Sequence, residues 1–515
     1  MHCGRWQQSY LARLVPDETW RGLSLPTCWR TAPALGRRRA HLVRTHDGSP
    51  DTIVGAMPRR DSGLDGVRLC EVVVDVSVVI VGGGQAGLSV SRELGELGVE
   101  HVVLEASQVA SAWRTRWDSF TLVTPNWTLD LPGSPYGGDD PEGHVGRDEI
   151  VAYLQKYAEQ HAGPIREGVR VDSLVPGGPS RLRLETNDGP IDADSVVVCT
   201  GAYQKPHRPR LAAAFPSDVL VLDAAGYANP ATLPDGKVLV IGSGQTGVQL
   251  AEEFHRAGRE TFLACGRAPW VPRRLGDKDV VTWLAGTPFF DQPVGALPGP
   301  AARLGANVQA SGARGGHDLH YRVLQNLGVQ LVGRLVGVSG GKVQFADDLA
   351  GSVAFGDARY NDIRNLLVKT FGDTLPEMPD PTTFHCDPLV EIDLAGFGAV
   401  VFTAGFRPDY ADWVNFPVFD DLGFPIVGDD LSTTVPWLYF CGVHFLRKRR
   451  SSLLCGVGQD AAIVAATVAR SRSVPFSAGE LPMKKRCMPL GRPTVSAPGV
   501  VGDQRPANRV DRSAG

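Results

Sequence analysis

One hydrophobic pattern occurs twice along the chain. An uninterrupted β-branched run at 78–81 precedes a glycine-rich turn, an amphipathic stretch and a second apolar run, and the same succession starts again at 238–241. Short apolar runs that alternate with helical periodicity are typical of parallel sheets covered by helices. The pattern therefore predicts two βαβ units. Their predicted elements are helices at 88–97 and 248–256 and strands at 78–81, 101–104, 238–241 and 261–264.

The rest of the body shows weaker periodic segments, and both ends show none. Residues 1–70 and 471–515 combine basic residues with scattered proline and glycine, which predicts a disordered extension and a disordered tail. A start of translation near 72–74 is an alternative reading of the first segment. The further predicted elements are helices at 150–159, 319–327, 359–371 and 458–470 and strands at 169–171, 182–184, 196–198, 329–332, 399–402 and 437–441.

The turn of the first unit is a dinucleotide fingerprint. Gly82 allows a sharp turn, Gly84 lets the backbone approach a pyrophosphate, and Gly87 lets the helix pack closely on the strand. The helix N-terminus adds unbonded N–H groups and a partial positive charge that favour phosphate. Glu105 ends the second strand, where a carboxylate accepts hydrogen bonds from ribose hydroxyls. The first unit therefore predicts a site for FAD or NAD.

The second unit carries the same glycines but no acid at its second strand end. Its glycines are Gly242, Gly244 and Gly247, and the arginines that follow its second strand are Arg267, Arg273 and Arg274. A carboxylate at this place would repel a 2′-phosphate, whereas a guanidinium pairs with it through two hydrogen bonds. The second unit therefore predicts an NADPH site. The alternative is that these arginines form a solvated basic face. Both units together predict an α/β fold with two Rossmann-like domains.

Composition excludes several classes of protein. The chain has 515 residues and a formal charge of −4 without a recurring basic stripe, which argues against a nucleic-acid partner. Its nine cysteines show neither a CxxC pair nor metal-ligand spacing, which favours a reducing compartment and predicts no metal site. No apolar run reaches the roughly 18 residues that a membrane span needs, and the N-terminus lacks a signal-peptide core. We therefore expect a cytoplasmic protein.

These motifs together resemble a known family of flavoproteins. Besides the fingerprints, the chain has a Cys199-Thr200-Gly201 turn before the second unit, a Thr403-Ala404-Gly405 turn near its end, and a last strand and helix. The arrangement over 75–470 resembles the flavin-containing (class B) monooxygenases and their bacterial FAD/NAD(P)-dependent oxidoreductase relatives. The resemblance implies an FAD-binding domain with an NADPH-binding domain inserted into it. The implied boundaries are 75–205 and 411–470 for the FAD domain and 206–410 for the NADPH domain.

The resemblance assigns roles to individual residues. Glu105 would bind the FAD ribose, Trp113 matches a family tryptophan that usually follows two glycines, and Thr200 and Gly201 match the crossing between the domains near the flavin. Asn126 matches an asparagine beside the flavin C4a position, and its alternative role is that of a turn residue after Pro125. The implied FAD phosphate site consists of Gly82, Gly84, Gln85, Ala86 and Gly87. The implied NADPH site consists of Gly242, Ser243, Gly244, Gln245, Thr246 and Gly247, with Arg267 and Arg273 or Arg274 at the 2′-phosphate.

One family motif is altered between the two units. The family has Phe-x-Gly-x-x-x-His-x-x-x-Tyr or Trp, whereas this chain has Ser217, Val219, Asp223 and Tyr227 at the four positions. Only the aromatic residue is kept, and Asp223 stands in place of the histidine. In the family this histidine couples domain movement to cofactor binding, so its loss puts the oxygenation step in doubt while it leaves the nucleotide sites in place.

The resemblance implies an FAD-dependent, NADPH-using monooxygenase. It would act with dioxygen on a small N-, S- or carbonyl-containing substrate through a C4a-(hydro)peroxyflavin. An NADPH oxidase or diaphorase, an NADPH-dependent disulfide reductase and a nucleotide-sensing regulator, for instance of ion transport, stay open as alternatives. The reductase would need two neighbouring cysteines, and the apolar surroundings of Cys199, Cys265, Cys441 and Cys455 predict core residues instead. A homodimer also stays open.

Overall fold

The computed structural model describes residues 74–178, 181–385 and 387–472. The predicted extension at 1–70 and nearly all of the predicted tail at 471–515 lie outside these residues. Within the described ranges, none of the helices combines the length and the apolar character that crossing a membrane would require.

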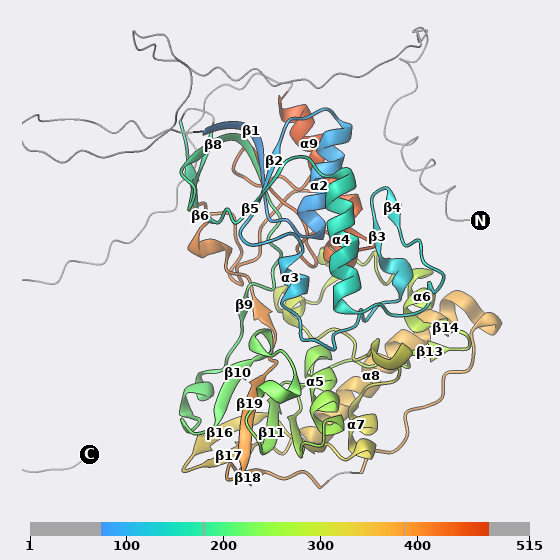
Figure 1. Cartoon of the computed structure of the whole chain (residues 1–515). Helices are drawn as coiled ribbons and strands as arrows, with labels where there is room; N and C mark the ends of the chain where they lie inside the picture. The colour runs from blue at the N-terminus through green and yellow to red at the C-terminus, as the bar shows by residue number, and fades with distance from the viewer. Residues whose placement is uncertain (1–73, 179–180, 386, 473–515) are drawn as a thin grey trace, which may run out of the picture. The chain divides into compact units, whose positions relative to one another are not determined.

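The first fingerprint belongs to a seven-stranded sheet with the order β5-β2-β1-β8-β7-β6 (Figure 1). The long strand β8 pairs with β1 along its whole length, with β7 through its first half and with β21 through its second half. The β1, β2, β5, β8 and β21 pairings are parallel, whereas β6 and β7 form an antiparallel edge. The strands are β1 (Val74–Val81), β2 (Val102–Glu105), β5 (Ile165–Glu167), β6 (Val171–Pro176), β7 (Leu182–Thr186), β8 (Ile191–Val198) and β21 (Leu438–Phe440).

Helices α2 (Gln85–Glu96), α4 (Arg147–His161) and α9 (Val457–Arg472) accompany this sheet. Helix α2 packs against both α9 and α4, so the last helix of the described chain lies beside the first fingerprint (Figure 1). Strands β1 and β8 are almost fully buried at their carboxyl ends, as expected of strands covered on both faces. The short elements of this region are α3 (Ser111–Arg114), β3 (Asp130–Leu131) and β4 (Ser134–Pro135).

The second fingerprint belongs to a five-stranded parallel sheet with the order β10-β19-β11-β12-β15. A separate antiparallel sheet, β16-β17-β18, accompanies it. The strands of these two sheets are β10 (Leu220–Asp223), β11 (Lys237–Ile241), β12 (Thr261–Ala264), β15 (Gln330–Val332), β16 (Leu335–Ser339), β17 (Lys342–Phe345), β18 (Glu391–Asp393) and β19 (Phe397–Phe402). Strands β13 (Arg274–Leu275) and β14 (Lys278–Asp279) form a separate antiparallel pair. The helices are α5 (Gln245–Arg256), α6 (Val280–Ala285), α7 (Tyr321–Leu327) and α8 (Leu349–Phe371).

Two short strands connect the sheets. Strand β9 (Lys205–Pro206) leaves the first sheet region and pairs with β20 (Phe406–Arg407), along which the chain returns. Gly201 and Gly405 precede these strands with φ values of +66° and +84°, a conformation that glycine adopts without strain. This crossing lies near the expected domain boundaries at 205 and 410, which themselves stay predictions.

The mixed α/β architecture and its parallel sheets confirm the predicted fold class, and four element predictions need correction. Helices α2 and α5 begin three residues before the predicted starts, because the last fingerprint residues already form the first helical turn. Helix α8 begins ten residues before the predicted 359, across Gly351 and Gly356, whose low helix propensity obscured it. The strand predicted at 169–171 is wrong, since β6 spans Val171–Pro176.

Candidate functional site

The first fingerprint requires glycine at two positions and leaves space at a third. Gly82 has a φ of +112°, and a Cβ there would lie 2.8 Å from the Cys199 carbonyl oxygen. A Cβ at Gly87 would lie 1.9 Å from the Gly82 carbonyl oxygen, so this glycine lets α2 approach the turn. A Cβ at Gly84 would meet no protein atom within 4 Å. This open position at the start of α2 fits a dinucleotide pyrophosphate.

Glu105 is held rigidly at the end of β2. Its side chain is buried, with 7% of its surface exposed. The Gly83 N–H donates to Oε2 over 2.7 Å, and the Ser107 N–H and Ser111 Oγ donate to Oε1 over 2.9 and 3.1 Å. Each oxygen of a carboxylate can accept more than one hydrogen bond, so Oε2 keeps capacity for a ribose hydroxyl. The fingerprint and the acid predicted beside it are thus brought together.

The second fingerprint repeats this backbone geometry. Gly242 has a φ of +107°, and a Cβ at Gly247 would lie 2.0 Å from the Gly242 carbonyl oxygen. A Cβ at Gly244 would make only an ordinary contact, 3.6 Å from Ala306 Cβ. The second turn therefore leaves the same space for a pyrophosphate at the start of α5.

A hydroxyl pair replaces the acid at the end of β12. Ser243 Oγ accepts from the Gly266 N–H over 2.8 Å and lies 2.6 Å from the Tyr321 hydroxyl, which donates to the Gly266 carbonyl over 2.6 Å. Burial raises the pKa of Tyr321, so this hydroxyl stays protonated. No carboxylate takes part in this arrangement. Sequence analysis missed Tyr321, because it lies 78 residues from Ser243 and carries no local motif.

The three predicted arginines differ in their surroundings. Arg267 is exposed and forms no ion pair with the described residues. Arg273 is 1% exposed, pairs with Asp279, and donates to the Val123 carbonyl over 2.8 Å. The exposed Arg274 donates to two backbone carbonyls over 3.2 Å. Arg273 is committed to an internal ion pair, which speaks against its predicted contact with the 2′-phosphate, whereas the position of Arg267 fits that contact.

The Arg273 ion pair belongs to a buried cluster with a histidine. Asp279 Oδ2 lies 3.4 Å from His144 Nε2, and both side chains are inaccessible to solvent. Burial alone would raise the pKa of Asp279, but His144 and Arg273 outweigh it and hold that pKa below its usual value. The cluster fastens the segment around His144 to the segment around Asp279.

A glutamine follows the second glycine in each fingerprint, and the side chain of each glutamine is hydrogen-bonded to a segment distant in sequence. Gln85 accepts from Trp113 Nε1 over 3.0 Å and donates to the Ser452 carbonyl over 3.2 Å. Gln245 donates to the Val308 carbonyl over 3.1 Å. The structure therefore places Trp113 and the segment before α9 beside the first fingerprint. Ala86 and Thr246 occupy the first turns of α2 and α5.

The turn at Thr200 and Gly201 is hydrogen-bonded to Tyr410, which lies shortly after β20. Tyr410 is fully buried and donates to the Gly201 carbonyl over 2.5 Å. The Gln204 amide donates to Thr200 Oγ1 over 2.8 Å. Thr200 and Gly201 thus lie directly after the carboxyl end of β8, next to the Gly82 turn.

Asn126 is buried, with 3% of its surface exposed. Its amide group donates to the Asp140 carbonyl over 2.9 Å, and its amide oxygen accepts from the Val145 N–H over 2.7 Å. Both ends of the side chain are therefore bonded to the backbone of the segment at 140–145. This geometry favours a positioning role over a direct contact with a ligand.

The altered linker motif has its own contacts. Asp223 accepts from Arg208 Nε over 2.8 Å, so an ion pair occupies the place of the family histidine. Tyr227 is buried and donates to Glu253 of α5 over 3.0 Å. Ser119 donates to the same carboxylate over 2.7 Å, which ties the segment after α3 to α5.

The cysteines lie in or beside the apolar core. Cys199, Cys265 and Cys441 are buried, and burial raises the pKa of the half-buried Cys455 to about 11. Cys199 and Cys441 follow the paired strands β8 and β21, and a hydrogen bond between their thiols, with burial, raises the pKa of Cys441. Sequence analysis missed this proximity. Among the described residues, no group of three or more His, Cys, Asp or Glu side chains could hold a metal ion.

Comparison with known proteins agrees with this geometry. The family model for pyridine nucleotide-disulphide oxidoreductases matches residues 79–287. An uncharacterized CzcO-like oxidoreductase of Geobacillus kaustophilus is 29% identical over 75% of this chain and 96% of its own length. The indole-3-pyruvate monooxygenase YUCCA1 of Oryza sativa subsp. japonica is 28% identical over 40% of this chain and 56% of its own length.

A solved structure shows the same fold. The flavin-containing monooxygenase from Stenotrophomonas maltophilia superposes with a TM-score of 0.55 at 23% identity, over 77% of this chain and 99% of that chain. The relatives and the two fingerprints give one consistent result. The chain is an oxidoreductase with flavin monooxygenases among its relatives, and both of its glycine turns leave the space that a dinucleotide pyrophosphate needs.

Proposed function

We propose that this protein is a monooxygenase that uses NADPH and FAD to transfer one oxygen atom from dioxygen to a small N-, S- or carbonyl-containing substrate. The main support for the proposal is that the two matching fingerprints are followed by different residues, Glu105 in the first unit and Arg267 in the second. This difference assigns FAD to the first site and NADPH to the second. The monooxygenases among the relatives support the oxygen-transfer step.

The first fingerprint would hold FAD. The open position at Gly84 and the N-terminus of α2 bind the pyrophosphate, and Glu105 accepts from the ribose. Ser452 is fastened to Gln85, and this contact places the N-terminus of α9 beside the same site. FAD held there would supply the acceptor for a hydride from NADPH and the electron donor for dioxygen.

The second fingerprint would hold NADPH. The start of α5 binds its pyrophosphate, and the exposed Arg267 pairs with its 2′-phosphate. Arg274 is exposed as well and adds positive charge nearby in sequence, while the ion-paired Arg273 supports the fold. A carboxylate is lacking at the end of β12, so no like charge opposes this phosphate.

Asn126 would act through the segment that it fixes. Its two backbone partners hold residues 140–145 in place, and the neighbouring Trp127 donates to Thr282 over 2.9 Å. We propose that Asn126 shapes the protein wall on the substrate side of the flavin and excludes water there. A direct hydrogen bond from its amide to a reacting group would require one of these partners to leave.

An NADPH oxidase is the second candidate, and one observation favours it. The ion pair between Asp223 and Arg208 replaces the histidine that couples domain movement to cofactor binding in the family. Weaker coupling would let reduced flavin react with dioxygen before a substrate is bound, and hydrogen peroxide would be the product.

A substrate screen separates the two candidates. FAD-loaded protein would be mixed with NADPH and with small amines, sulfides and ketones, while NADPH consumption and peroxide release are measured together. A monooxygenase releases less peroxide per NADPH consumed when its substrate is present. One peroxide per NADPH with every compound would overturn the proposal and identify an oxidase.

A further inference from the structure

The hydrogen bond that closes each glycine turn shows which residues of the two units are equivalent. The N–H of the first fingerprint glycine donates to the Leu104 carbonyl in the first unit and to the Ala264 carbonyl in the second, over 2.7 and 3.1 Å. The residues that follow these acceptors, Glu105 and Cys265, therefore occupy equivalent places at the two strand ends. Cys265 is fully buried. The second unit thus has a buried thiol where the first unit has its carboxylate.

Tyr321 supplies the polar group of the second strand end from a different element. It is the first residue of α7, it is 3% exposed, and its hydroxyl lies 2.6 Å from Ser243 Oγ. Ser243 stands between the first two fingerprint glycines, as Gly83 does in the first unit, where the Gly83 N–H donates to Glu105. In both units a buried polar group therefore contacts the residue between these glycines. The group is a carboxylate in the first unit and a phenol in the second.

Tyr321, Ser243 and Gly266 form a closed ring of hydrogen bonds. The Gly266 N–H donates to Ser243 Oγ over 2.8 Å, and the Tyr321 hydroxyl donates to the Gly266 carbonyl over 2.6 Å. Each hydroxyl has one proton and two lone pairs, so the Ser243 hydroxyl donates to the Tyr321 oxygen and completes the ring. Burial raises the pKa of Tyr321, which keeps the phenol protonated in this arrangement. Both backbone groups of Gly266 are thereby bonded.

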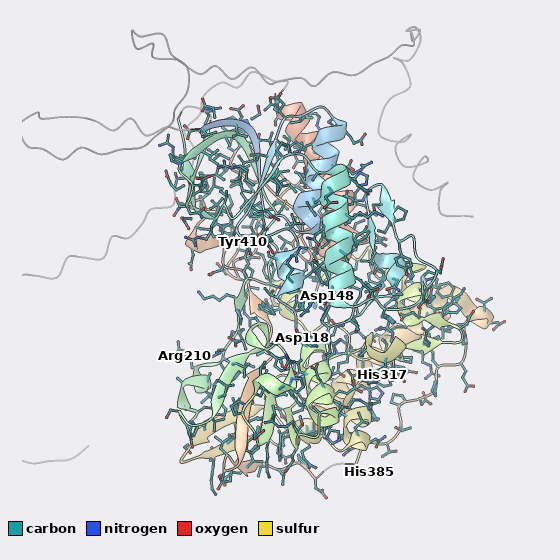
Figure 2. The ribbon with its side chains drawn as sticks, viewed as in Figure 1. Asp118, Asp148, Arg210, His317, His385 and Tyr410 are labelled. Carbon is teal, nitrogen blue, oxygen red and sulfur yellow. The ribbon has the colours of Figure 1, made fainter. Side chains whose placement is uncertain are left out.

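Two further contacts hold the ring in place. Gln309 is fully buried, its Nε2 donates to the Ser243 carbonyl over 2.7 Å, and its backbone N–H donates to the Pro269 carbonyl over 2.8 Å. The segment before α7 is held on α5, because His317 Nε2 lies 2.9 Å from Glu252 Oε1 (Figure 2 labels His317). The glycine turn, the end of β12 and the start of α7 are therefore fixed relative to one another.

Arg267 extends from the backbone that this ring fixes. Gly266 precedes it with both backbone groups bonded, and Ala268 follows it with 1% of its surface exposed. The Arg267 side chain between them is exposed, and a Cβ at Gly266 would meet no protein atom within 4 Å. The arginine is therefore attached to a fixed backbone beside open space at the end of β12.

We propose that Tyr321 positions Arg267 for the 2′-phosphate and thereby determines the preference of the second unit for NADPH. Tyr321 provides a neutral group where a carboxylate would repel the phosphate. It also fixes Gly266, so the guanidinium has less freedom to lose when it pairs with the phosphate. Tyr321 acts through Arg267 and is a positioning residue. The inference rests on the proposed assignment of NADPH to this unit.

The test compares the binding of two nucleotides that differ only in the 2′-phosphate. Adenosine 2′,5′-bisphosphate and adenosine 5′-monophosphate would be titrated calorimetrically into FAD-loaded wild type and Tyr321→Phe. Tyr360→Phe is the matched control, because Tyr360 of α8 is also buried and also donates to a backbone carbonyl, that of Pro379. Phenylalanine keeps the packed ring, so each variant loses only a hydroxyl. Bound flavin content and the far-ultraviolet circular dichroism spectrum verify the fold of each variant.

The measured quantity is the ratio of the two affinities. We expect wild type and Tyr360→Phe to prefer the bisphosphate and Tyr321→Phe to lose about tenfold of this preference, the size of a charge-assisted hydrogen bond. A Tyr321→Phe ratio within about twofold of wild type would overturn the inference, even if both affinities fall, because an equal fall indicates a merely structural role. A wild type without any preference for the bisphosphate would contradict the NADPH assignment itself, so the two failures are distinguishable.

A double variant tests whether Tyr321 acts through Arg267. In a protein that already carries Arg267→Ala, Tyr321→Phe should change the ratio by less than about twofold, because residues that act as a unit are not additive. Independent, additive losses from the two substitutions would overturn the positioning role.

A second variant guards against a folding defect. If Tyr321→Phe does not retain FAD, Ser243→Ala is titrated in its place, because it opens the same ring on the side of the glycine turn. We expect a loss of preference in the same direction, about three- to tenfold. An unchanged ratio in Ser243→Ala would contradict the proposal. Because no variant needs to turn over, a failed monooxygenase assay does not affect this result.

Discussion

The two βαβ units have nearly the same backbone and differ at one strand end. Gly82 and Gly242 share a φ close to +110°, and α2 and α5 are both 12 residues long and begin at a glutamine. At the end of β2 the buried Glu105 accepts three hydrogen bonds, whereas Ser243, Tyr321 and Gly266 form a neutral arrangement beyond β12. We therefore propose that the glycine turn binds a dinucleotide and that the group at the strand end selects which dinucleotide it is.

The arginines of the second unit make a similar contrast within one segment. Arg267 is exposed, whereas Arg273, six residues later, is buried against Asp279. Sequence analysis placed Arg267 at the 2′-phosphate together with either Arg273 or Arg274. Burial and pairing separate a residue that can contact a ligand from one that stabilises the fold.

The largest expected effect is that of Arg273→Ala on stability. Removal of the guanidinium leaves Asp279 charged and buried, which should lower the free energy of unfolding by about 3–5 kcal/mol. Urea unfolding followed by circular dichroism measures this change, with Arg267→Ala as the control that should leave the midpoint unchanged. Equal midpoints for the two variants would show that the contrast between these arginines is wrong.

The same ion pair predicts a dependence on pH. The pKa of Asp279 is lowered in the folded state, so the stability from its ionised form is present above the ordinary aspartate pKa of about 3.9 and is lost as the pH falls through the lowered pKa. The advantage of wild type over Arg273→Ala should therefore be complete at pH 7 and shrink as the pH falls from about 4 to about 2. A constant difference across this range would argue against an ionised Asp279.

Alanine at the third fingerprint glycine tests whether the two turns are equivalent. Because the new Cβ would meet a backbone oxygen at 1.9 Å in Gly87→Ala and at 2.0 Å in Gly247→Ala, each variant should lose about 3 kcal/mol of stability. Thermal unfolding midpoints of both variants provide the measurement. A loss in one variant only would mean that the two turns are packed differently.

Glu105→Gln should weaken FAD binding about 10- to 100-fold. A hydrogen bond to a charged group contributes about 1.5–3 kcal/mol, and the new amide N–H₂ also faces the donors that now bind the carboxylate. Flavin fluorescence titration of the apoprotein gives the affinity, and the exposed Glu100→Gln is the control. The affinity for NADP⁺ should not change, and a parallel loss there would contradict the separation of the two sites.

Arg267→Ala should have the smallest effect, confined to cofactor choice. The ratio of kcat/KM for NADPH to that for NADH should fall about tenfold, because the 2′-phosphate loses its cationic partner. Steady-state NAD(P)H oxidation gives the ratio, and Arg274→Ala should change it less than Arg267→Ala does. An equal fall for both nicotinamide cofactors is the result that excludes this role.

Local spacing made the fingerprints, the parallel sheets and Glu105 predictable, because their residues lie within one βαβ unit. The contacts across the chain were not predictable in this way. Arg273 is paired with Asp279 and His144, and the latter lies 135 residues before Asp279. Asn126 matched a family position by sequence, but only the fold shows that its amide is bonded to Asp140 and Val145. Tyr321 carried no motif at all, and its place at the end of β12 is visible only in three dimensions.

One pair of variants tests the assignment of FAD to the first unit and NADPH to the second. A side chain at Gly84 or Gly244 meets little protein but fills the space for a pyrophosphate. Gly84→Val and Gly244→Val would be purified and mixed anaerobically with NADPH while the flavin absorbance is recorded. We predict that Gly84→Val is folded and colourless, and that Gly244→Val is yellow but is not reduced by NADPH. A yellow, reducible Gly84→Val or a colourless Gly244→Val would contradict the assignment.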